Sequence, residues 1–257
     1  MDMRLTFDED AANYDQWRPR YCDKLFEDVI RYSEIDSEKN AVEIGCGTGQ
    51  ATEPFLKTGC SVIAVELGKQ LASFTKNKFA KYSNFQVENV AFEVFQHRND
   101  SIDLVYSATA FHWIPEEIGY KKVFDMLKKG GTIALFWNKP RRPDDLLNQK
   151  IDSIYTNYEA EGKFSSSVSA NVIKGSKSAA DDILKYGFIE LMRPVYKQTR
   201  KFTAENYISL LNTYSDHRAM KPLDQYDLYN DITLAINSFG GSIEIYDSIE
   251  LYLAKKP

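Results

Sequence analysis

The sequence has no apolar run that approaches the roughly 18 consecutive residues needed to cross a lipid bilayer. Its first residues, Met1 to Leu5, include an acid and lack the apolar stretch of a secretory signal. With 13 glycines and 8 prolines among 257 residues, the composition is not that of a fibrous or disordered chain. These absences predict a globular, cytoplasmic protein without a membrane partner.

Cysteine and net positive charge are also scarce. The three cysteines, Cys22, Cys46 and Cys60, are odd in number and follow no zinc-ligand spacing, which predicts reduced thiols and no structural metal. The 32 basic residues are outnumbered by 37 acidic ones, which gives a net charge of −5. A chain of this charge lacks the basic surface of a general nucleic-acid binder, so no nucleic-acid partner is expected. The sequence leaves the oligomeric state open.

The first 140 residues alternate short apolar runs with amphipathic runs, which is typical of βαβ units. Five runs are predicted as strands, and several are apolar nearly throughout, as in strands covered on both faces: Ala41–Gly45, Val62–Glu66, Phe85–Asn89, Ile102–Ser107 and Thr132–Trp137. Helices are predicted between them, including one over Thr48–Lys57 and a later one that Gly130 ends. The expected fold class is α/β, doubly wound around a mostly parallel sheet.

The pattern changes after residue 140. Residues 141–178 contain no strand-like run and are predicted as an insertion that is helical around Leu146–Tyr158. Phe188–Arg200 reads as a polar strand, and the period of two over Ile243–Leu253 marks a half-exposed strand. Together these strands predict an antiparallel C-terminal edge on the sheet. We therefore expect a single domain over 1–257, with its core at about 36–140 and 179–257 and a helical cap at about 141–178 and 203–239.

The most informative stretch is a strand beginning at Ala41 that leads into a loop with three glycines, Gly45, Gly47 and Gly49. Glycines at such a turn let a ligand approach the backbone, and in an open parallel sheet this turn lies where ligands bind. The G-x-G-x-G spacing is one residue tighter than the dinucleotide fingerprint. Glu43, just before the loop, would repel a pyrophosphate and attract an ammonium group. Glu66, at the end of the next strand, is placed to accept hydrogen bonds from two ribose hydroxyls.

This combination resembles the first two motifs of the class I S-adenosylmethionine-dependent methyltransferases, and residues Glu43 to Gly49 are close to that family's consensus. Along most of the chain, the sequence resembles one branch of this family, which includes the methyltransferase type 11 proteins and the trans-aconitate methyltransferases. It implies a Rossmann-like, seven-stranded sheet and S-adenosyl-L-methionine as cofactor, with the glycine loop under the methionine part and Glu66 on the ribose. The residues that the resemblance assigns to the cofactor are Tyr14, Arg18, Glu43, Gly45, Cys46, Gly47, Thr48, Gly49, Glu66, Leu67, Ala91, Phe92, Ser107 and Ala108.

Two further pieces carry the resemblance. Residues Phe7 to Tyr21 resemble the branch's opening segment, in which a tyrosine and an arginine, here Tyr14 and Arg18, close over the methionine end of the cofactor. The arginine would supply a fork for the methionine carboxylate. Residues Ser107 to Trp113 resemble the motif after the fourth strand, which often ends in His-Trp and faces cofactor and substrate.

The sequence departs from the family after the third predicted strand. Family members often carry an acid there that accepts a hydrogen bond from the adenine amino group, and no Asp occupies the expected place in this chain. Three alternatives remain open for holding the adenine: the backbone near Ala91 and Phe92, apolar packing, or Glu93.

Methyl transfer from a sulfonium is an in-line displacement, and alignment and desolvation can supply much of its catalysis. A base is needed only where the nucleophile must lose a proton. His112, one of three histidines, lies in the loop after the fourth strand and is the candidate base. Aromatic faces favour a sulfonium, and the chain is rich in them, with 16 Tyr, 15 Phe and 3 Trp. The residues expected to line the acceptor pocket are Phe111, Trp113, Trp137, Tyr214 and Arg218.

Motifs that the sequence lacks argue against several methyltransferase subclasses. It has no Asp/Asn-Pro-Pro-aromatic motif for amino methylation of nucleic acids and no Pro-Cys nucleophile. Ser107 stands where a magnesium-dependent catechol site would need an acid. The expected reaction is therefore methyl transfer to a small molecule, with a carboxylate or hydroxyl among the acceptors considered. The alternatives are a nucleic-acid or protein methyltransferase, a dinucleotide oxidoreductase and a cofactor-binding regulatory module.

Overall fold

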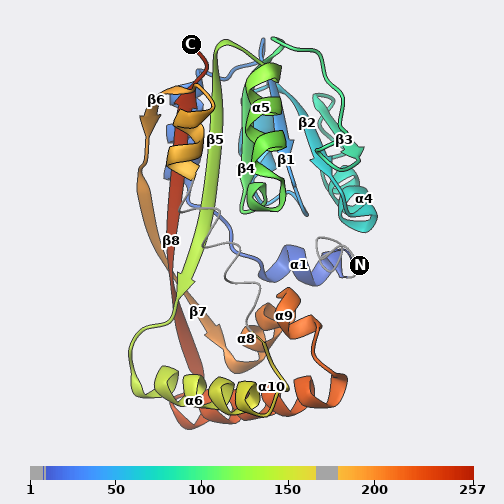
Figure 1. Cartoon of the computed structure of the whole chain (residues 1–257). Helices are drawn as coiled ribbons and strands as arrows, with labels where there is room; N and C mark the ends of the chain where they lie inside the picture. The colour runs from blue at the N-terminus through green and yellow to red at the C-terminus, as the bar shows by residue number, and fades with distance from the viewer. Residues whose placement is uncertain (1–7, 9, 166–178) are drawn as a thin grey trace.

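The computed structural model describes residues 8, 10–165 and 179–257, and Figure 1 shows how their elements are arranged. The described strands form one sheet in the order β3-β2-β1-β4-β5-β8-β6, with β7 also paired to β8. Strands β1 to β5 are parallel to one another, and β8 is antiparallel to β5, β6 and β7. This confirms the predicted α/β class with its antiparallel C-terminal edge. The bounds are β1 Asn40–Ile44, β2 Ser61–Glu66, β3 Phe85–Asn89, β4 Ile102–Ala108, β5 Leu127–Arg141, β6 Ile189–Met192, β7 Val195–Thr203 and β8 Ser242–Lys255.

The sheet has eight strands rather than the expected seven because the predicted strand Phe188–Arg200 is interrupted. Both β6 and β7 pair with β8 on the edge opposite β5, so together they fill the seventh position. The break between them contains Pro194, which has no backbone N–H to donate to a neighbouring strand. Its carbonyl still accepts a hydrogen bond from the Leu251 N–H at 3.0 Å.

Buried residues form a hydrophobic cluster on each face of the sheet. On one face the cluster includes side chains of α5 (Glu116–Met126) and of helical residues 179–185. On the other it includes α2 (Asp23–Ser33) and α3 (Thr52–Leu56). Because both faces are covered, the central strand β4 is buried over most of its length. Helix α4 (Lys69–Lys78) packs beside β2 and β3.

Two helix boundaries differ from the prediction. Helix α3 begins at Thr52 rather than Thr48, because positive φ angles at Gly47 and Gly49 keep the preceding residues in a turn. Helix α5 ends at Met126, and the chain becomes extended at Leu127, which is fully buried and begins β5. Gly130, expected to end the helix, therefore lies inside the strand with a φ of 75°.

Strands β5, β7 and β8 extend beyond the parallel part of the sheet, as Figure 1 shows. A buried polar cluster joins the three strands. The Arg200 guanidinium is ion-paired with Asp247, and Asp247 also accepts a hydrogen bond from Asn138 Nδ2 at 3.0 Å. The Asp247 side chain is fully buried, so its charge depends on these donors.

The far end of these strands carries a helical layer, here called the cap. It consists of α6 (Leu146–Ala160), α8 (Ala204–Leu211), α9 (Ser215–Arg218) and α10 (Pro222–Ser238), which share a third hydrophobic cluster. The remainder of the predicted insertion, residues 166–178, lies outside the described residues. Helix α1 (Ala11–Trp17) contacts α8 and α4 and so lies between the cap and the sheet (Figure 1). In the part of the chain that the structure describes, no helix is long and apolar enough to span a membrane.

Candidate active site

The loop after β1 has a conformation that glycine adopts far more easily than other residues. The φ angles are 66° at Gly45, 57° at Gly47 and 81° at Gly49. A Cβ at Gly45 would lie 2.5 Å from the Cβ of Ala110, and one at Gly49 would lie 2.3 Å from a ring carbon of Phe79. The loop is therefore packed tightly against the rest of the protein at both ends. At Gly47 the nearest atom, a ring carbon of Tyr14, would be 3.5 Å from the added Cβ, which is an ordinary contact distance, and Gly47 lines a cavity.

Glu66, the last residue of β2, connects the loop to the second strand. Its Oε2 accepts a hydrogen bond from the Gly47 N–H and its Oε1 from the Gly68 N–H, both at 2.8 Å. Burial raises the pKa of this carboxyl, and the two backbone donors oppose that shift. Each carboxylate oxygen has a second lone pair. Glu66 can therefore hold the loop and still accept hydrogen bonds from a ligand's hydroxyls.

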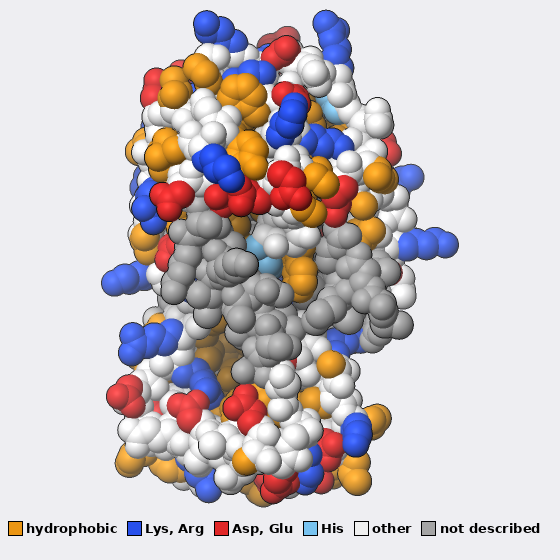
Figure 2. Space-filling model, in the orientation of Figure 1, with side chains coloured by type: hydrophobic (Ala, Val, Ile, Leu, Met, Phe, Trp, Pro, Cys, Tyr) orange, Lys and Arg blue, Asp and Glu red, His pale blue; other side chains and the backbone are white. Residues whose placement is uncertain are grey.

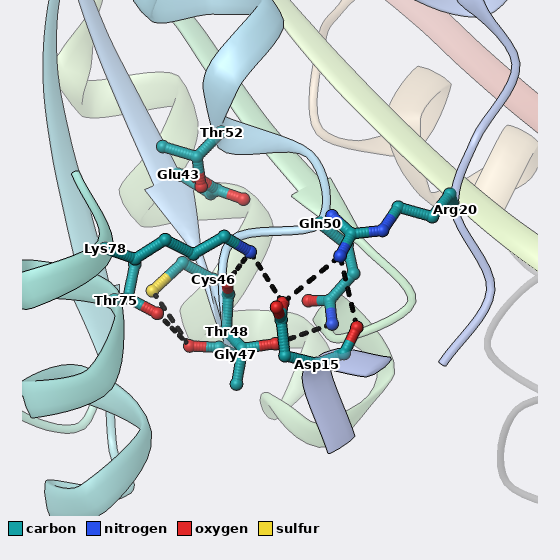
Figure 3. A network of polar contacts seen from close by, with 10 residues as sticks. All are labelled: Asp15, Arg20, Glu43, Cys46, Gly47, Thr48, Gln50, Thr52, Thr75 and Lys78. Carbon is teal, nitrogen blue, oxygen red and sulfur yellow. Dashed lines mark hydrogen bonds and ion pairs between the residues drawn. The ribbon is translucent and has the colours of Figure 1, made fainter. Parts of the chain in front are cut away.

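Helix α4 supports the loop from the side, as Figure 3 shows. Thr75 Oγ1 donates to the Gly47 carbonyl at 2.7 Å, and Lys78 Nζ donates to the Thr48 carbonyl at 2.9 Å. Lys78 is also ion-paired with Asp15 at 2.6 Å, which anchors α1 beside the loop. Thr75 and Lys78 could not be singled out from the sequence, because two polar residues one turn apart on a helix form no recognisable motif.

Glu43 lies in β1 beneath the loop and is only 1% exposed. Its Oε2 accepts hydrogen bonds from Thr52 Oγ1 at 2.6 Å and from the Tyr106 hydroxyl at 3.0 Å. Its Oε1 is buried without a hydrogen-bond partner among the described residues. Burial raises the pKa of Glu43 to about 8, so the carboxyl is mostly neutral at pH 7. The expected role of Glu43 in placing an amino group stays a prediction, with Oε1 as the atom that could meet it.

Replacing Glu43 with glutamine is expected to change how stability depends on pH. The carboxyl has a pKa of about 8 in the folded state and an ordinary value of 4.5, so the folded state binds the proton more tightly. Wild-type protein should then lose stability as pH rises between these values, by at most about 1.4 kcal/mol per pH unit from this group. In urea titrations, Glu43→Gln should gain stability relative to wild type between about pH 6 and about pH 8. A difference that stays constant with pH would contradict the raised pKa.

The chain turns sharply where β4 ends beside the glycine loop. Thr109 has a φ of 55°, which is unusual for a β-branched residue and marks local strain. Its N–H donates to the Phe136 carbonyl at 2.8 Å, and its Oγ1 contacts the Tyr21 hydroxyl at 2.9 Å and accepts from the Asn138 N–H at 3.3 Å. These contacts fix the direction in which residues 110–113 leave the strand.

His112 lies in the short helix Phe111–Trp113 that follows this turn. Its Nδ1 accepts a hydrogen bond from the Trp137 indole Nε1 at 3.2 Å. Its Nε2 is buried and has no hydrogen-bond partner among the described residues. Burial lowers the pKa of His112 to about 4, so the ring is neutral at pH 7.

A cavity of about 760 Å³ extends from the glycine loop to the cap. On the face of the molecule that Figure 2 shows, basic and acidic side chains are interspersed over both the sheet region and the cap. The structure brings thirteen of the residues expected from sequence to the cavity wall: Tyr14, Arg18, Gly45, Cys46, Gly47, Glu66, Leu67, Ala91, Phe92, Ala108, His112, Trp113 and Tyr214.

Four residues expected to contact the cofactor do not line the cavity: Glu43, described above, and three that support the site from behind, Thr48, Gly49 and Ser107. Thr48 is fully buried, and its Oγ1 accepts a hydrogen bond from Gln50 Nε2 at 2.6 Å. Ser107 Oγ donates to the Ile44 carbonyl at 2.8 Å and so links β4 to β1. Gly49 is enclosed by Phe79, as described above. At these positions the local packing leaves no open side toward the cavity.

Three residues expected in the acceptor pocket are also absent from the cavity wall. Phe111 is buried and packs edge-on against Tyr120, at 4.9 Å between ring centres. Trp137 is buried and packs edge-on against Tyr252 at 5.7 Å. Arg218 stays half-buried at the end of α9, where its charge keeps contact with solvent. An aromatic residue near a strand end can pack in the core or line a pocket, so the sequence alone could not show which of the two Phe111 and Trp137 do.

Arg18 lies where α1 ends, at the junction with the cap. Its Nη2 donates to the Thr213 carbonyl at 2.7 Å. Its guanidinium carbon lies 4.8 Å from the ring centres of both Tyr14 and Tyr214, within the range of cation–π contacts. The contact of Arg18 with a carboxylate stays a prediction, but the side chain links the end of α1 to residues 213–214 of the cap beside the cavity.

The cap also adds wall residues beyond the five residues expected to line the acceptor pocket. Tyr155, Phe164, Tyr207, Ser215 and His217 come from separate helices and loops and meet only in the folded chain. His217 is 3% exposed, its Nε2 contacts the Tyr155 hydroxyl at 3.1 Å, and burial lowers its pKa to about 3. The surplus of aromatic residues in the sequence was one signal for such a pocket.

Residues 42–135, which run from β1 through the glycine loop and Glu66 into β5, match the family of methyltransferase domains. The chain belongs to the class I S-adenosylmethionine-dependent methyltransferases. This methyltransferase is 24% identical to an uncharacterized methyltransferase of Schizosaccharomyces pombe, over 82% of this chain and 78% of that protein. It is 30% identical to a probable S-adenosylmethionine-dependent methyltransferase of Saccharomyces cerevisiae, over 50% of this chain and 45% of that protein.

Solved structures share the fold. A proposed type II methyltransferase of Anaeromyxobacter dehalogenans superposes with a TM-score of 0.68 at 18% identity, covering 93% of this chain and 98% of that one. A phosphoethanolamine N-methyltransferase of Haemonchus contortus, solved with S-adenosyl-L-methionine, superposes with a TM-score of 0.58 at 13% identity, covering 100% of this chain and 60% of that one. At these identities the likeness establishes the Rossmann-like fold.

The cofactor of the methyltransferase is S-adenosyl-L-methionine, and the residues around the loop fit it. Gly47 lines the cavity, Glu66 offers lone pairs for hydroxyls, and Glu43 Oε1 is buried and unpartnered in the described structure. Leu67 and Phe92 add apolar wall beyond the ends of β2 and β3, where a planar base could pack. When bound, the cofactor supplies an electrophilic methyl group on a sulfonium.

Proposed function

We propose that this methyltransferase methylates a small molecule that binds between the glycine loop and the cap. The observation that carries the proposal is one cavity with Gly45, Gly47 and Glu66 at one end and the cap residues Tyr207 and His217 at the other. Its volume of about 760 Å³ is in the range of small-molecule sites. A space of this size, partly roofed by the cap, supports a compact acceptor rather than a nucleic-acid or folded-protein substrate.

The polar atoms at the cap end support an acceptor that forms hydrogen bonds. Ser215 Oγ, His217 Nδ1 and Arg142 Nη1 are buried and have no hydrogen-bond partner among the described residues, and all three residues line the cavity. Leaving such groups unpaired costs free energy, which a bound polar molecule would offset. Ser215 and Arg142 are donors, so an oxygen nucleophile of a carboxylate or hydroxyl group is the acceptor that we favour.

The chain's own contribution to the reaction is alignment and the exclusion of water. The glycine loop and Glu66 fix one reactant, and the aromatic side chains of the cap enclose the other: Tyr155, Phe164, Tyr207 and Tyr214. Two reactants held in this way react without the entropy loss of a free encounter. Removing water from around the nucleophile strengthens this effect.

The proposal is tested in two stages. Calorimetry should show binding of S-adenosylhomocysteine and none of NAD or NADP at comparable concentrations. Incubation with methyl-labelled S-adenosyl-L-methionine and a panel of organic acids, phenols and amines should then transfer label to at least one compound. Binding without transfer to any small compound, together with labelling of protein or RNA, would contradict a small-molecule acceptor.

A larger side chain at the cap end of the cavity should distinguish the region that binds the acceptor from the region that binds the cofactor. Ser215→Phe adds a large side chain beside His217, so we expect S-adenosylhomocysteine to bind within about threefold of wild type while methyl transfer falls by at least about tenfold. Ser153→Phe, on the exposed side of α6, is the matched control and should leave both quantities unchanged. Loss of cofactor affinity in Ser215→Phe alone would show that the cofactor extends under the cap.

A further inference from the structure

The contact between Trp137 and His112 determines more than packing. An indole Nε1 carries a hydrogen and can only donate, so the His112 Nδ1 that receives it at 3.2 Å must present a lone pair. A neutral imidazole with its lone pair on Nδ1 carries its proton on Nε2. Trp137 is 1% exposed and packed against Tyr252, so the donor is held in place by the core.

This tautomer is the wrong one for a base acting through Nε2. To accept a proton there, His112 would first have to move its own proton to Nδ1, where it would face the indole N–H of Trp137. Protonation of the whole ring would create the same conflict between two donors. The contact therefore opposes both forms of His112 that proton abstraction requires.

The Nε2–H group is also a buried donor that lacks a partner in the described structure, although His112 lines the cavity. A buried N–H without an acceptor is unfavourable unless a ligand supplies one. The strained turn at Thr109, held by Tyr21 and Phe136, fixes the position from which His112 leaves β4. Backbone strain is often found at functional sites, and ligands of open parallel sheets bind at the ends of central strands. The strained turn before His112 is therefore typical of a functional contact.

We propose that His112 positions the methyl acceptor by donating a hydrogen bond from Nε2 to an oxygen of that molecule, and that Trp137 acts as a positioning residue by fixing the tautomer. This rests on the proposed function and corrects the role of base expected for His112. His112 then does not remove a proton from the nucleophilic atom of the acceptor. That atom must already have a lone pair available for the methyl group when the acceptor binds. A carboxylate oxygen satisfies this without assistance, whereas a phenol or alcohol would need another base.

The first test reads the tautomer directly. In protein labelled with ¹⁵N-histidine, long-range ¹H–¹⁵N spectra distinguish a protonated from an unprotonated ring nitrogen, and the His112→Gln variant assigns the signals among those of His97 and His217. We expect Nε2 of His112 to be protonated and Nδ1 unprotonated throughout the range from about pH 6 to about pH 8. In Trp137→Phe the Nδ1-protonated form should appear. The proposal would be overturned if His112 of the wild-type protein carried its proton on Nδ1. It would also be overturned if the Trp137→Phe variant showed the same tautomer as wild type.

The second test compares two variants with the compound that wild-type enzyme methylates in the panel above. His112→Gln keeps an N–H donor near the place of Nε2 but has no basic nitrogen, and His112→Leu has neither. We expect Leu to raise KM and lower kcat/KM by at least about tenfold and Gln to recover most of that loss. Equal and severe loss of kcat in both variants would mean that His112 is a base, because neither side chain can accept a proton.

Binding of S-adenosylhomocysteine separates failure of this proposal from failure of the proposed function. If wild type binds it and the spectra show the opposite tautomer, the role of His112 is refuted while methyl transfer stands. If wild type does not bind it, the proposed function fails whatever the tautomer.

Discussion

Glu66→Ala is expected to reduce the affinity for S-adenosylhomocysteine by at least about a hundredfold, which corresponds to about 3 kcal/mol. The variant removes the acceptor of the Gly47 N–H and of the Gly68 N–H and also the lone pairs offered to a ligand. Both losses act on the same site, because the Gly47 N–H belongs to the loop that faces the cavity. Isothermal titration calorimetry measures the affinity directly.

Glu88→Ala is the matched control for this variant. Glu88 is an exposed acid on the neighbouring strand β3, paired in register with Val65 beside Glu66. Its removal changes the charge near the same edge of the sheet without touching the loop, so the affinity should stay within about twofold of wild type. Wild-type affinity in Glu66→Ala would refute the placement of the cofactor at this carboxylate, and equal loss in both variants would show that net charge alone matters.

Gly45→Ala is expected to lower the free energy of unfolding by about 3 kcal/mol and to weaken cofactor binding with it. A side chain at a φ of 66° costs about 1–2 kcal/mol, and the new Cβ would lie 2.5 Å from the Cβ of Ala110. Relief of that clash moves either the glycine loop or the turn after β4, and both line the cavity. Urea unfolding followed by circular dichroism gives the first quantity and calorimetry the second.

Gly130→Ala isolates the backbone part of this effect. Gly130 has a φ of 75°, close to that of Gly45, but a Cβ there would meet no atom within 4 Å. We therefore expect a cost of about 1 kcal/mol and unchanged binding of S-adenosylhomocysteine. If both variants lowered the free energy of unfolding by the same amount, the close approach of Ala110 would not be what restricts residue 45 to glycine.

The parts of the candidate site that can be recognised in the sequence are those set by neighbouring residues. The glycine loop and Glu66 are recognisable because a strand, a turn with positive φ and a carboxylate at the end of the next strand follow one another at short range. Parallel pairing of β1 with β2 then places Ile44 beside Val65 and leaves Glu66 next to the loop. Two details differ: the helix begins later, at Thr52, because the glycines delay it, and Thr48 and Gly49 of the loop do not line the cavity.

The roles of aromatic and polar residues at strand ends could not be predicted in the same way. Trp137 and His112 were both expected at the pocket, and the sequence contains nothing that makes one a core residue and the other a wall residue. Trp137 becomes a core residue because its side chain lies in the hydrophobic cluster on one face of the sheet, against Tyr252 of β8, and this packing is a long-range property of the fold. The tautomer of His112 depends on the same arrangement, because its donor comes from 25 residues further along the chain.

The fold class, the glycine loop and the carboxylate at the end of the second strand could be recognised in the sequence, since each depends on periodicity and turn chemistry within a few residues. The cap end of the cavity, the support of the loop by Thr75 and Lys78, and the contact of His112 with Trp137 arise only in the folded chain. Those features join segments far apart in the chain, and their contacts exist only after the long strands β5, β7 and β8 have brought the cap over the end of the sheet.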